Sequence, residues 1–595
     1  MEKILENIKT LFWKNRISTK ATRKKASWEE TLIREGKYAY FSDINYECQD
    51  IAIWDTLNHL YRMQEKLCSV GVEFLKDGVL IEDMCAALNF WVEKDFQNPN
   101  WWFNQIGTVN TLSTLVIMLW EYLTDEQVLR ANAIIRRGSA AAVPDILKWT
   151  GANLIWGIRN TVHHAVLTGD KKLMKLAAER TAQEISIAEG LAEGIKPDMS
   201  FYQHGAVLYS CGYGRSFTCD TAQLIVIFSG SEFAINAEKT ALFEKFLLEG
   251  QRYMMRGVAV DFQTVGREIA RPDALSSSAF LSTLDLIIEL GEFKRTNELK
   301  AYRDSLAGKT ESFSSTKYFP YSYFLSHNTR EFHISVKGYH TNYKGSEWGL
   351  RENRLGYNLN CGGVTAFMAS GREYLNLNPL IDFSAIPGTT ASAWNEARLW
   401  EASEGDWKSK PGTNDECDGW ADGGYGVLYM RLEHDEISGY KSWFAFPKGM
   451  VCLGCAIQGP EPLYTTVDQA FREGDSFFKS VLARGERITN GGFCYVNLSD
   501  SPIIAEEKEV IGSWKRNSLS ESDEIVKGKV FIASIDHTNS DNYAYAVVAK
   551  EHSCDSILSY VNTKEEQRVD FYDGYSMAVK RENGKTKIIV NGVIV

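Results

Sequence analysis

Residues suited to proton transfer lie together in one polar, aromatic segment of the first half of the chain. His204 follows Gln203, and Tyr213 comes nine residues later in a stretch that contains glycine. An imidazole can accept a proton near neutral pH, and a phenol becomes a stronger acid when cations lie beside it. Each residue alone would be interpreted as a packed core side chain, but the pair predicts a site where both act on one proton.

Two arginines are the next candidates. Arg267 and Arg271 are four residues apart, so a helix would present them on one face. Because like charges so placed repel, we expect an anionic group to lie between or before them. A solvated helix face is the simpler interpretation, and an anion-binding cleft is the functional one.

Asn153 and two tryptophans extend this set. Asn153 opens a predicted helix after Thr150, where an asparagine commonly caps the helix. Its amide could instead donate to a substrate carboxylate, although spacing alone favours the cap. Trp101 and Trp102 precede another predicted helix. Either one indole is buried and the other exposed, or the two form a platform for sugar rings, whose C–H faces pack on indoles. The sequence pattern favours neither interpretation over the other.

The elements that would carry these residues divide the chain into two halves. Apolar residues recur at helical spacing in the first half, at 106–123, 171–191 and 276–290. Breaks with glycine, proline or aspartate separate these segments, which favours an array of helical hairpins or a toroid. From about residue 311 the pattern alternates and predicts antiparallel sheet, as at 331–337, 425–432 and 451–457.

Shorter alternating runs at 530–535 and 543–548 predict a further sandwich at the C-terminus. Helices first and strands afterwards indicate an α+β multidomain protein. We therefore expect a helical catalytic domain at residues 1–315, a central antiparallel β domain at 316–505 and a small C-terminal β domain at 506–595.

Composition limits the partners and the compartment. The net charge is −12 and the basic runs include only Arg23-Lys24-Lys25, so nucleic acid is disfavoured. Cys452 and Cys455 lack the further ligands of a zinc site, which predicts buried free thiols and a reducing compartment. The first residues lack a signal-peptide pattern, and the apolar runs are too short to cross a membrane. We expect a cytoplasmic monomer without membrane partners, or a secreted protein if a leader has been removed.

Taken together, these segments resemble polysaccharide lyase family eight, which contains hyaluronate, chondroitin AC and xanthan lyases. The resemblance is colinear and spans most of the chain. The matching pieces, in order, are Asn100-Trp101-Trp102 with Ile106-Gly107, Thr150-Gly151-Ala152-Asn153, Ser200-Phe201-Tyr202-Gln203-His204 with Tyr213-Gly214, Gly266-Arg267 with Arg271, Glu352-Asn353, Pro387-Gly388-Thr389-Thr390, Lys441-Ser442-Trp443-Phe444, Leu453-Gly454, and Ile535-Asp536-His537 with Tyr543-Ala544-Tyr545.

The resemblance implies an incomplete (α/α) toroid followed by antiparallel β-sandwich domains. It also implies site residues. The catalytic set falls on Asn153, His204, Tyr213, Arg267, Arg271 and Glu352, and the substrate-binding set on Trp101, Trp102, Asn104, Gln203 and Asn353. No cofactor is required, and a structural divalent cation would be compatible with the family.

The implied reaction is β-elimination on an acidic polysaccharide or oligosaccharide. A base removes the proton next to the uronate carboxylate, and the bond to the glycosidic oxygen on the adjacent carbon breaks. Because a carboxylate resists further negative charge, donors must hold it: Asn153, helped by His204. Tyr213, its pKa lowered by Arg267, is the expected base and then the acid, although the sequence leaves open whether His204 or Tyr213 takes the proton. Glu352 would orient the group.

Several positions depart from the family pattern and bear on the substrate. They are Gln105 in place of Glu, Met199 in place of Gly, Ala270 in place of Ser, and the stretch 336–344. Hyaluronan or chondroitin is favoured, followed by xanthan-like glycans. Two other readings stay open at this point. One is a glycoside hydrolase, which needs two carboxylates and could use only Asp198 and Glu352. The other is a sugar-binding protein without activity.

Overall fold

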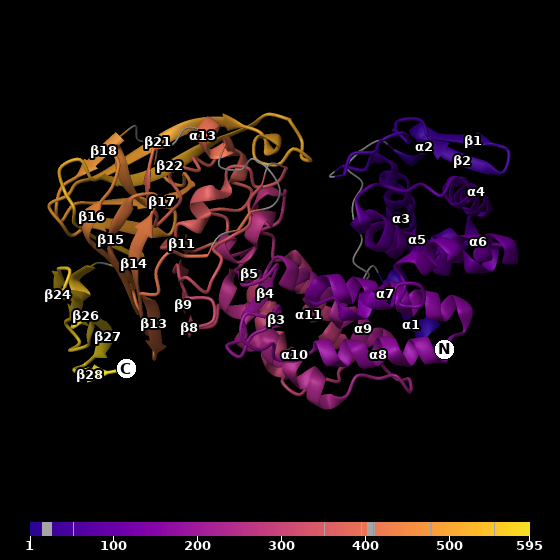
Figure 1. The fold of residues 1–595 in the computed structure, drawn as a ribbon, viewed down its shortest axis with the longest axis horizontal. Helices are drawn as coiled ribbons and strands as arrows, with labels where there is room; N and C mark the ends of the chain where they lie inside the picture. The colour runs from indigo at the N-terminus through magenta and orange to yellow at the C-terminus, as the bar shows by residue number, and fades with distance from the viewer. Residues whose placement is uncertain are drawn as a thin grey trace. The chain divides into compact units, whose positions relative to one another are not determined.

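The computed structural model describes residues 1–14, 27–51, 53–349, 351–393, 396–401, 408–409, 411–475, 479–552 and 554–595. The basic run Arg23-Lys24-Lys25 lies outside these ranges. The chain forms two compact units (Figure 1). The first unit comprises Met1–Ser186, Arg215–Glu244 and Ser282–Thr296, and the second comprises Ile187–Gly214, Lys245–Leu281 and Asn297–Val595.

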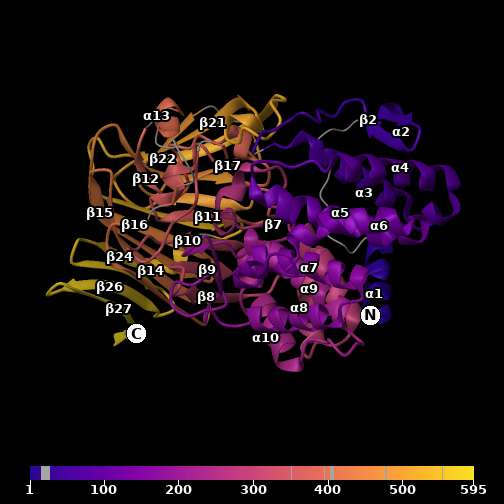
Figure 2. The same cartoon turned by 45° about the vertical axis from the view of Figure 1, so that its right-hand side comes forward.

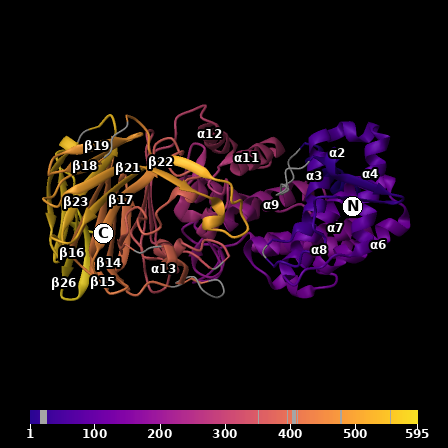
Figure 3. The ribbon, with the colours of Figure 1, turned by 90° about the horizontal axis from the view of Figure 1, so that it is seen from above.

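The first unit is helical, and its helices gather into one body (Figure 3). Its complete helices are α1 (Glu2–Trp13), α2 (Trp28–Thr31), α3 (Asn58–Val70), α4 (Gly78–Lys94), α5 (Thr108–Leu119), α6 (Asp125–Ile135), α7 (Gly151–Thr168) and α8 (Lys171–Glu184). Parts of α9 (Tyr213–Phe228), α10 (Ala237–Glu249) and α11 (Ser278–Leu290) join them, as does the hairpin of β1 (Leu32–Glu35) and β2 (Tyr38–Phe41).

Local signals start and stop these helices. Thr124 and Gln127 form a capping box at the start of α6, and Asp170 caps α8 through two backbone N–H groups. The helix predicted at 171–191 ends earlier, at Glu184, because the chain becomes extended and Ile187 bridges to Ile195. In the part of the chain that the structure describes, no helix is both long and apolar enough to traverse a lipid bilayer.

The second unit is built mainly from antiparallel sheets. Its seven-stranded sheet contains, in spatial order, β13 (Cys417–Asp422), β14 (Tyr425–His434), β15 (Ile437–Phe446), β16 (Gly449–Gln458), β23 (Tyr543–Ala549), β20 (Phe493–Asn497) and β19 (Arg487–Asn490). A four-stranded sheet contains β11 (Val364–Met368), β10 (His333–Lys337), β9 (Phe324–Asn328) and β8 (Ser315–Phe319). A five-stranded sheet contains β12 (Thr390–Ser392), β17 (Leu463–Phe471), β22 (Val526–Asp536), β21 (Ile503–Gly512) and β18 (Lys479–Leu482).

The C-terminal sheet covers the outer face of the seven-stranded one (Figure 2). It contains β24 (Ile557–Asn562), β25 (Glu566–Phe571), β26 (Ser576–Glu582), β27 (Lys585–Val590) and β28 (Val593–Ile594). Along β14, Leu428 and Met430 enter the core shared with the other sheets, whereas Val427 and Tyr429 face the C-terminal sheet. Because both faces are buried, these strands read as nearly continuous apolar runs.

The predicted fold class, helices followed by antiparallel β-sandwich domains, is confirmed. The start of the C-terminal domain is corrected. Strands β21, β22 and β23 pair into the central sheets, and the separate C-terminal sheet begins only at Ile557, so a boundary at 506 would cut β21. Alternation identifies a strand but not the strand with which it pairs. None of the eleven cysteines, all within the described residues, is in a disulfide, and Cys452 and Cys455 are buried, as predicted.

Candidate active site

His204 lies at the tip of a small hairpin in the second unit. The flanking strands are β4 (Phe201–Gln203) and β5 (Val207–Leu208). His204 has φ +57°, a conformation that costs an L-residue about 1–2 kcal/mol. Glu193 holds the turn, because its carboxylate accepts from Gln203 Nε2 at 2.5 Å and from the Gly205 N–H at 2.9 Å. Gln203, predicted to contact substrate, is only 1% exposed and shapes this turn instead.

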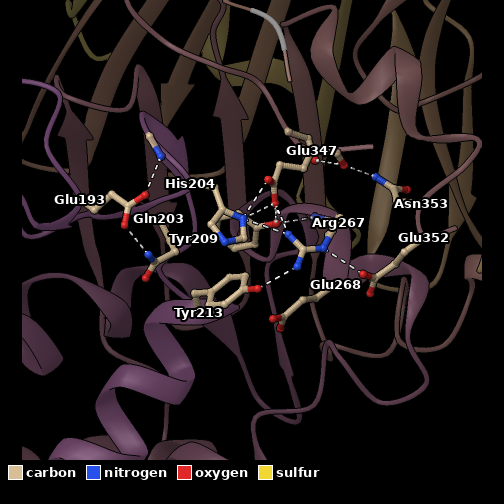
Figure 4. A network of polar contacts seen from close by, with 12 residues as sticks. Glu193, Gln203, His204, Tyr209, Tyr213, Arg267, Glu268, Glu347, Glu352 and Asn353 are labelled. Atoms are coloured by element: carbon tan, nitrogen blue, oxygen red, sulfur yellow. Dashed lines mark hydrogen bonds and ion pairs between the residues drawn. The ribbon is translucent and has the colours of Figure 1, made fainter. Parts of the chain in front are cut away.

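Glu347 determines which ring nitrogen of His204 carries the proton, because its carboxylate faces Nδ1 (Figure 4). Both carboxylate oxygens lie 2.8 Å from His204 Nδ1. Arg267 Nη1 is also 3.0 Å from Nδ1, but the two carboxylate oxygens require a proton on that nitrogen. The lone pair therefore resides on Nε2, which makes no hydrogen bond to any described residue. The imidazole remains 29% exposed, so Nε2 can accept a proton.

Glu347 is buried and fully charged. Burial by itself would raise its pKa, but the Arg267 guanidinium and the hydrogen bonds from His204 and Tyr209 bring the pKa down to about 2. Tyr209 donates to Oε2 at 2.6 Å, and Arg267 forms an ion pair with the same oxygen. Glu347 was not among the predicted site residues, and the supporting role was assigned to Glu352.

Tyr213 begins α9 beside this cluster. Its ring centroid lies 4.6 Å from that of His204, and Arg267 Nη2 donates to its hydroxyl oxygen at 2.8 Å. Burial raises the pKa of Tyr213, and the positive charges of Arg267 and Arg271 offset only part of that rise. Arg267 does lower the pKa of Tyr213, as expected, but burial outweighs the two cations, so the net pKa is raised.

Glu352 is the anion between the two arginines. Arg267 Nε lies 2.9 Å from Oε2 and Arg271 Nη2 lies 3.2 Å from the same oxygen. The arginines do not share an α-helical face as expected, because Gly266–Ala270 is a 3₁₀ turn and Arg271 is extended. The Arg267 side chain is only 9% exposed, whereas the Arg271 side chain is 41% exposed. Arg271 is thus the more exposed of the two arginines, with Nε and Nη2 on Glu352 and Nη1 3.3 Å from Glu268.

Two local features hold these groups in place. Gly266 has φ +55°, and a Cβ there would lie 2.2 Å from the Tyr209 ring, so only glycine lets Arg267 approach Tyr209. Asn353 was predicted to bind substrate, but it is 0% exposed and its amide donates to the Glu347 carbonyl at 2.8 Å. Asn353 therefore fixes the position of the Glu347 backbone.

Asn153 belongs to the first unit. It is the third residue of α7, whose N-cap is Thr150, so the interpretation as a cap is wrong. Its side chain is half-buried, and no hydrogen bond joins it to another described residue. The amide is therefore free to donate to a ligand, and its role in binding a carboxylate stays a prediction.

The aromatic residues of the first unit differ in exposure. Trp101 is 48% exposed and lies 5.3 Å from Trp149, centroid to centroid. Trp102 is partly buried, packs edge-on against Trp156 at 6.0 Å and lines a pocket with it. Asn104, predicted to bind substrate, instead bonds the Asn98 backbone with both ends of its amide, at 2.9 and 2.6 Å. The Asn104 amide therefore stabilises the turn that precedes Trp101 and Trp102.

Comparison with known proteins gives a consistent result along the chain. The model of the polysaccharide lyase family 8 N-terminal alpha-helical domain matches residues 6–307, and that of the family 8 super-sandwich domain matches residues 314–558. Chondroitinase-AC of Pedobacter heparinus is 26% identical over 570 residues, which cover 90% of this chain and 78% of that protein. Hyaluronate lyase HylB of Cutibacterium acnes is 21% identical, covering 78% of this chain and 62% of that protein.

Solved structures agree on the fold. A chondroitinase AC lyase studied as enzyme–oligosaccharide complexes has a TM-score of 0.83 at 23% identity, covering 99% of this chain and 94% of that chain. A Paenibacillus xanthan lyase has a TM-score of 0.75 at 17% identity, covering 99% of this chain and 64% of that chain. This chain thus spans less than two thirds of the length of that xanthan lyase and of HylB.

Proposed function

Because the chain belongs to polysaccharide lyase family 8 and is therefore a carbon–oxygen lyase, we propose that it cleaves a uronate-containing glycan of the chondroitin or hyaluronan type. The names of its relatives, chondroitinase and hyaluronate lyase, support this substrate class. The observation that carries the proposal is the convergence of His204, Tyr213 and Arg267 around one buried carboxylate, Glu347. An unused imidazole nitrogen and a phenol side by side are what the reaction requires: one group removes the proton from one carbon, and the other protonates the oxygen that leaves the adjacent carbon.

His204 is the better base of the pair. Its Nδ1–H is held by an ionised carboxylate, so Nε2 carries the free lone pair. When Nε2 takes the proton next to the uronate carboxylate, Glu347 stabilises the imidazolium that forms. This arrangement has the logic of a base oriented by a buried carboxylate.

Tyr213 is the better acid. Burial raises its pKa, so the phenol keeps its proton at neutral pH and can deliver it to the leaving glycosidic oxygen. Arg267 Nη2 donates to the phenol oxygen and so stabilises the negative charge left there. We propose this division of roles in place of a single tyrosine acting as both base and acid.

The substrate carboxylate needs donors as negative charge builds up on it. The Arg271 side chain is 41% exposed, and Asn153 carries an amide without a partner among the described residues. We propose that Arg271 holds the carboxylate in the second unit, and carboxylate binding by Asn153 of the first unit stays a separate prediction. Arg267 is committed to Glu347, Glu352 and Tyr213 and keeps the cluster together.

Hydrolysis is disfavoured by the state of the two candidate carboxylates. Asp198 accepts from the Ser200 N–H and hydroxyl on one oxygen and from the Tyr321 N–H on the other. Glu352 is bound by two arginines, which lower its pKa although burial opposes them. A retaining or inverting hydrolase needs one carboxyl group that stays protonated to act as acid, and Glu352 does not.

The test is a spectroscopic assay with a panel of polymers. Elimination creates a conjugated, unsaturated uronate that absorbs in the ultraviolet, whereas hydrolysis creates none. We expect an absorbance increase with chondroitin or hyaluronan and a smaller one with xanthan. No increase with any uronate polymer, with reducing ends nevertheless appearing, would overturn the proposal in favour of hydrolysis.

A phenylalanine at position 213 tests the acid. Tyr213→Phe removes the proton donor and should lower kcat by about 10²–10⁴-fold while the polymer still binds. Tyr302→Phe is the matched control, because Tyr302 is a buried tyrosine of the same unit whose hydroxyl contacts only the Met255 sulfur among described residues. Equal kcat values for wild type and Tyr213→Phe would remove Tyr213 from the mechanism.

A further inference from the structure

A second cluster of reactive side chains lies in the second unit and takes no part in the site described above. It consists of Cys361, His434 and Asp435, whose donor atoms all lie within 4.8 Å of one another. Cys361 follows the 3₁₀ turn Gly356–Asn360, His434 ends β14, and Asp435 lies in the turn between β14 and β15. Two distant parts of the chain therefore bring a thiol, an imidazole and a carboxylate to one point.

The Cys361 thiol of this cluster donates to Asn358 Oδ1 at 3.6 Å, but one ring nitrogen of His434 has no hydrogen bond among the described residues. Cys361 is 0% exposed and His434 is 5% exposed. His434 Nδ1 lies 3.3 Å from Asp435 Oδ2, and Nε2 is buried without a hydrogen bond to any described residue. Tyr339, which packs against Gly362, also has a buried hydroxyl without a partner in the described chain. Buried polar groups in proteins are nearly always paired, so such a gathering indicates a ligand.

The backbone aims Asp435 into the cluster. His434 pairs with Ile437 across a two-residue turn, and Asp435 and Glu436 have φ +47° and +65°. Positive φ at both positions defines a type I′ hairpin, which usually needs Asn or Gly, so these residues are held in an uncommon conformation. Tyr357 donates to Asp435 Oδ1 at 2.7 Å, which leaves Oδ2 facing His434. Fixing a carboxylate through its second oxygen is typical of metal ligands.

We propose that Cys361, His434 and Asp435 bind a divalent metal ion of the zinc type. Thiolate, imidazole and carboxylate are the three donors that zinc takes in proteins. Ligand atoms about 2.0–2.3 Å from a tetrahedral zinc ion stand roughly 3.3–3.8 Å from each other. The three donor atoms lie within 4.8 Å of one another, and small side-chain rotations bring them to this spacing. Water would complete the coordination.

Charge and access support the assignment. A thiolate and a carboxylate placed together in a buried site repel each other, and a divalent cation balances both. The thiol proton is released on binding. The Asp435 side chain is 26% exposed, which gives the ion a route from solvent, while the other two ligands stay covered.

The bound ion would stabilise the segment that carries the active-site glutamates. Cys361 directly follows Asn360, whose side-chain oxygen accepts from the Ser346 N–H at 2.6 Å. Ser346 precedes Glu347, so this hydrogen bond joins the start of the segment 346–361 to its end. A metal ion that links Cys361 to the β14–β15 hairpin would hold the joined ends of this segment in place. The role is structural, and the reaction needs no metal at this position.

The test measures metal binding directly on the full chain. After treatment with a chelator, the protein is titrated with Zn²⁺ and with Co²⁺, and bound metal is measured by elemental analysis. We expect a single equivalent of Zn²⁺, a raised Tm, and a thiolate-to-cobalt charge-transfer band in the near ultraviolet with Co²⁺. Absence of that band in the wild-type protein overturns the proposal.

Variants identify the ligands. Cys361→Ser should abolish the charge-transfer band, and His434→Gln and Asp435→Asn should each weaken Zn²⁺ binding at least about tenfold. Cys494→Ser is the matched control, because Cys494 is a buried thiol on β20 outside the cluster, and it should bind like wild type. Retention of the band by Cys361→Ser assigns the metal elsewhere and overturns the proposal. If Cys361→Ser does not fold, the exposed Asp435→Asn change still decides the question. These readouts are independent of lyase activity.

Discussion

Two of the histidine–carboxylate pairs in the second unit, His333 with Asp261 and His204 with Glu347, differ in one nitrogen. His333 Nε2 bonds Asp261 at 2.9 Å and its Nδ1 bonds Asn328 at 3.0 Å, with both members of the pair 0% exposed. His204 uses only Nδ1, on Glu347, and is 29% exposed. A carboxylate next to a histidine is therefore no mark of catalysis by itself. What sets His204 apart is an unused, accessible nitrogen within the cluster of Tyr213 and Arg267.

The carboxylates of the two pairs also have different partners. Asp261 accepts from neutral groups as well as from His333: the Gln263 N–H at 2.9 Å and the Ser335 hydroxyl. Glu347 is paired with Arg267, a group that stays charged at all relevant pH values. Glu347 can thus remain ionised while His204 gains and loses a proton, which a carboxylate held by neutral donors supports less well.

The largest expected effect separates the two histidines. His204→Ala should lower kcat by about 10³-fold, because it removes the base, with little change in Tm. His333→Ala should leave kcat per folded molecule within about threefold, but lower the free energy of unfolding by about 3–5 kcal/mol, because Asp261 loses a buried partner. Steady-state kinetics and urea unfolding of both variants give the answer. If His204→Ala and His333→Ala lost equal amounts of kcat, the distinction between a catalytic and a structural histidine would be wrong.

The same contrast applies to asparagine amides in the first unit. Asn153 has no partner among the described residues, whereas Asn7 donates to the carbonyls of Val226, Ile227 and Ser229. Asn153→Ala should lower kcat by about 10²–10³-fold, as for an oxyanion donor, without loss of stability. Asn7→Ala should lose stability and keep kcat. An Asn153→Ala enzyme with wild-type kcat would leave carboxylate binding to Arg271.

This contrast also shows what the sequence could and could not predict. His204, Tyr213 and Arg267 were identified by residue type and order, and they do converge. Glu347 was missed because it lies 143 positions from His204, and no local pattern says which of two nearby glutamates faces the histidine.

Two substrate assignments were wrong for a related reason. Gln203 and Asn353 were assigned through the family resemblance, in the motifs that contain His204 and Glu352. Both side chains are buried, at 1% and 0% exposure, and neither faces solvent. Gln203 accordingly bonds Glu193, and Asn353 bonds the Glu347 carbonyl. The strands of the fold were predicted well because alternation is local, whereas their pairing into sheets depends on distant partners.

Acid stability distinguishes the charged pair from the neutral one. The pKa of Glu347 is about 2 in the folded protein against an ordinary value of 4.5. The unfolded chain therefore binds an extra proton between these pH values, so stability is fully present above about pH 4.5 and is lost as the pH falls toward 2. The contribution is about 3 kcal/mol. Urea unfolding between about pH 6 and pH 3 should show a steeper fall for wild type than for Glu347→Gln. Parallel curves would mean that Glu347 is not the group that titrates.

The smallest expected effect extends the comparison to the two tryptophans. Trp101 is 48% exposed and keeps a free face, whereas Trp102 packs against Trp156 and Phe103, and a Cβ at Gly107 would lie 2.8 Å from its ring. A sugar stacked on Trp101 would gain about 0.5–1.5 kcal/mol. Trp101→Ala should therefore raise KM about 2- to 13-fold at constant kcat and Tm, and Trp101→Phe should restore part of the loss. Trp102→Ala should lower Tm instead, since its ring fills space within the first unit. If KM stays unchanged for Trp101→Ala on every polymer that the enzyme cleaves, Trp101 is an exposed indole without a role in binding. Exposure of an apolar ring would then not be enough to predict a function, whereas the exposed imidazole nitrogen of His204 does predict one.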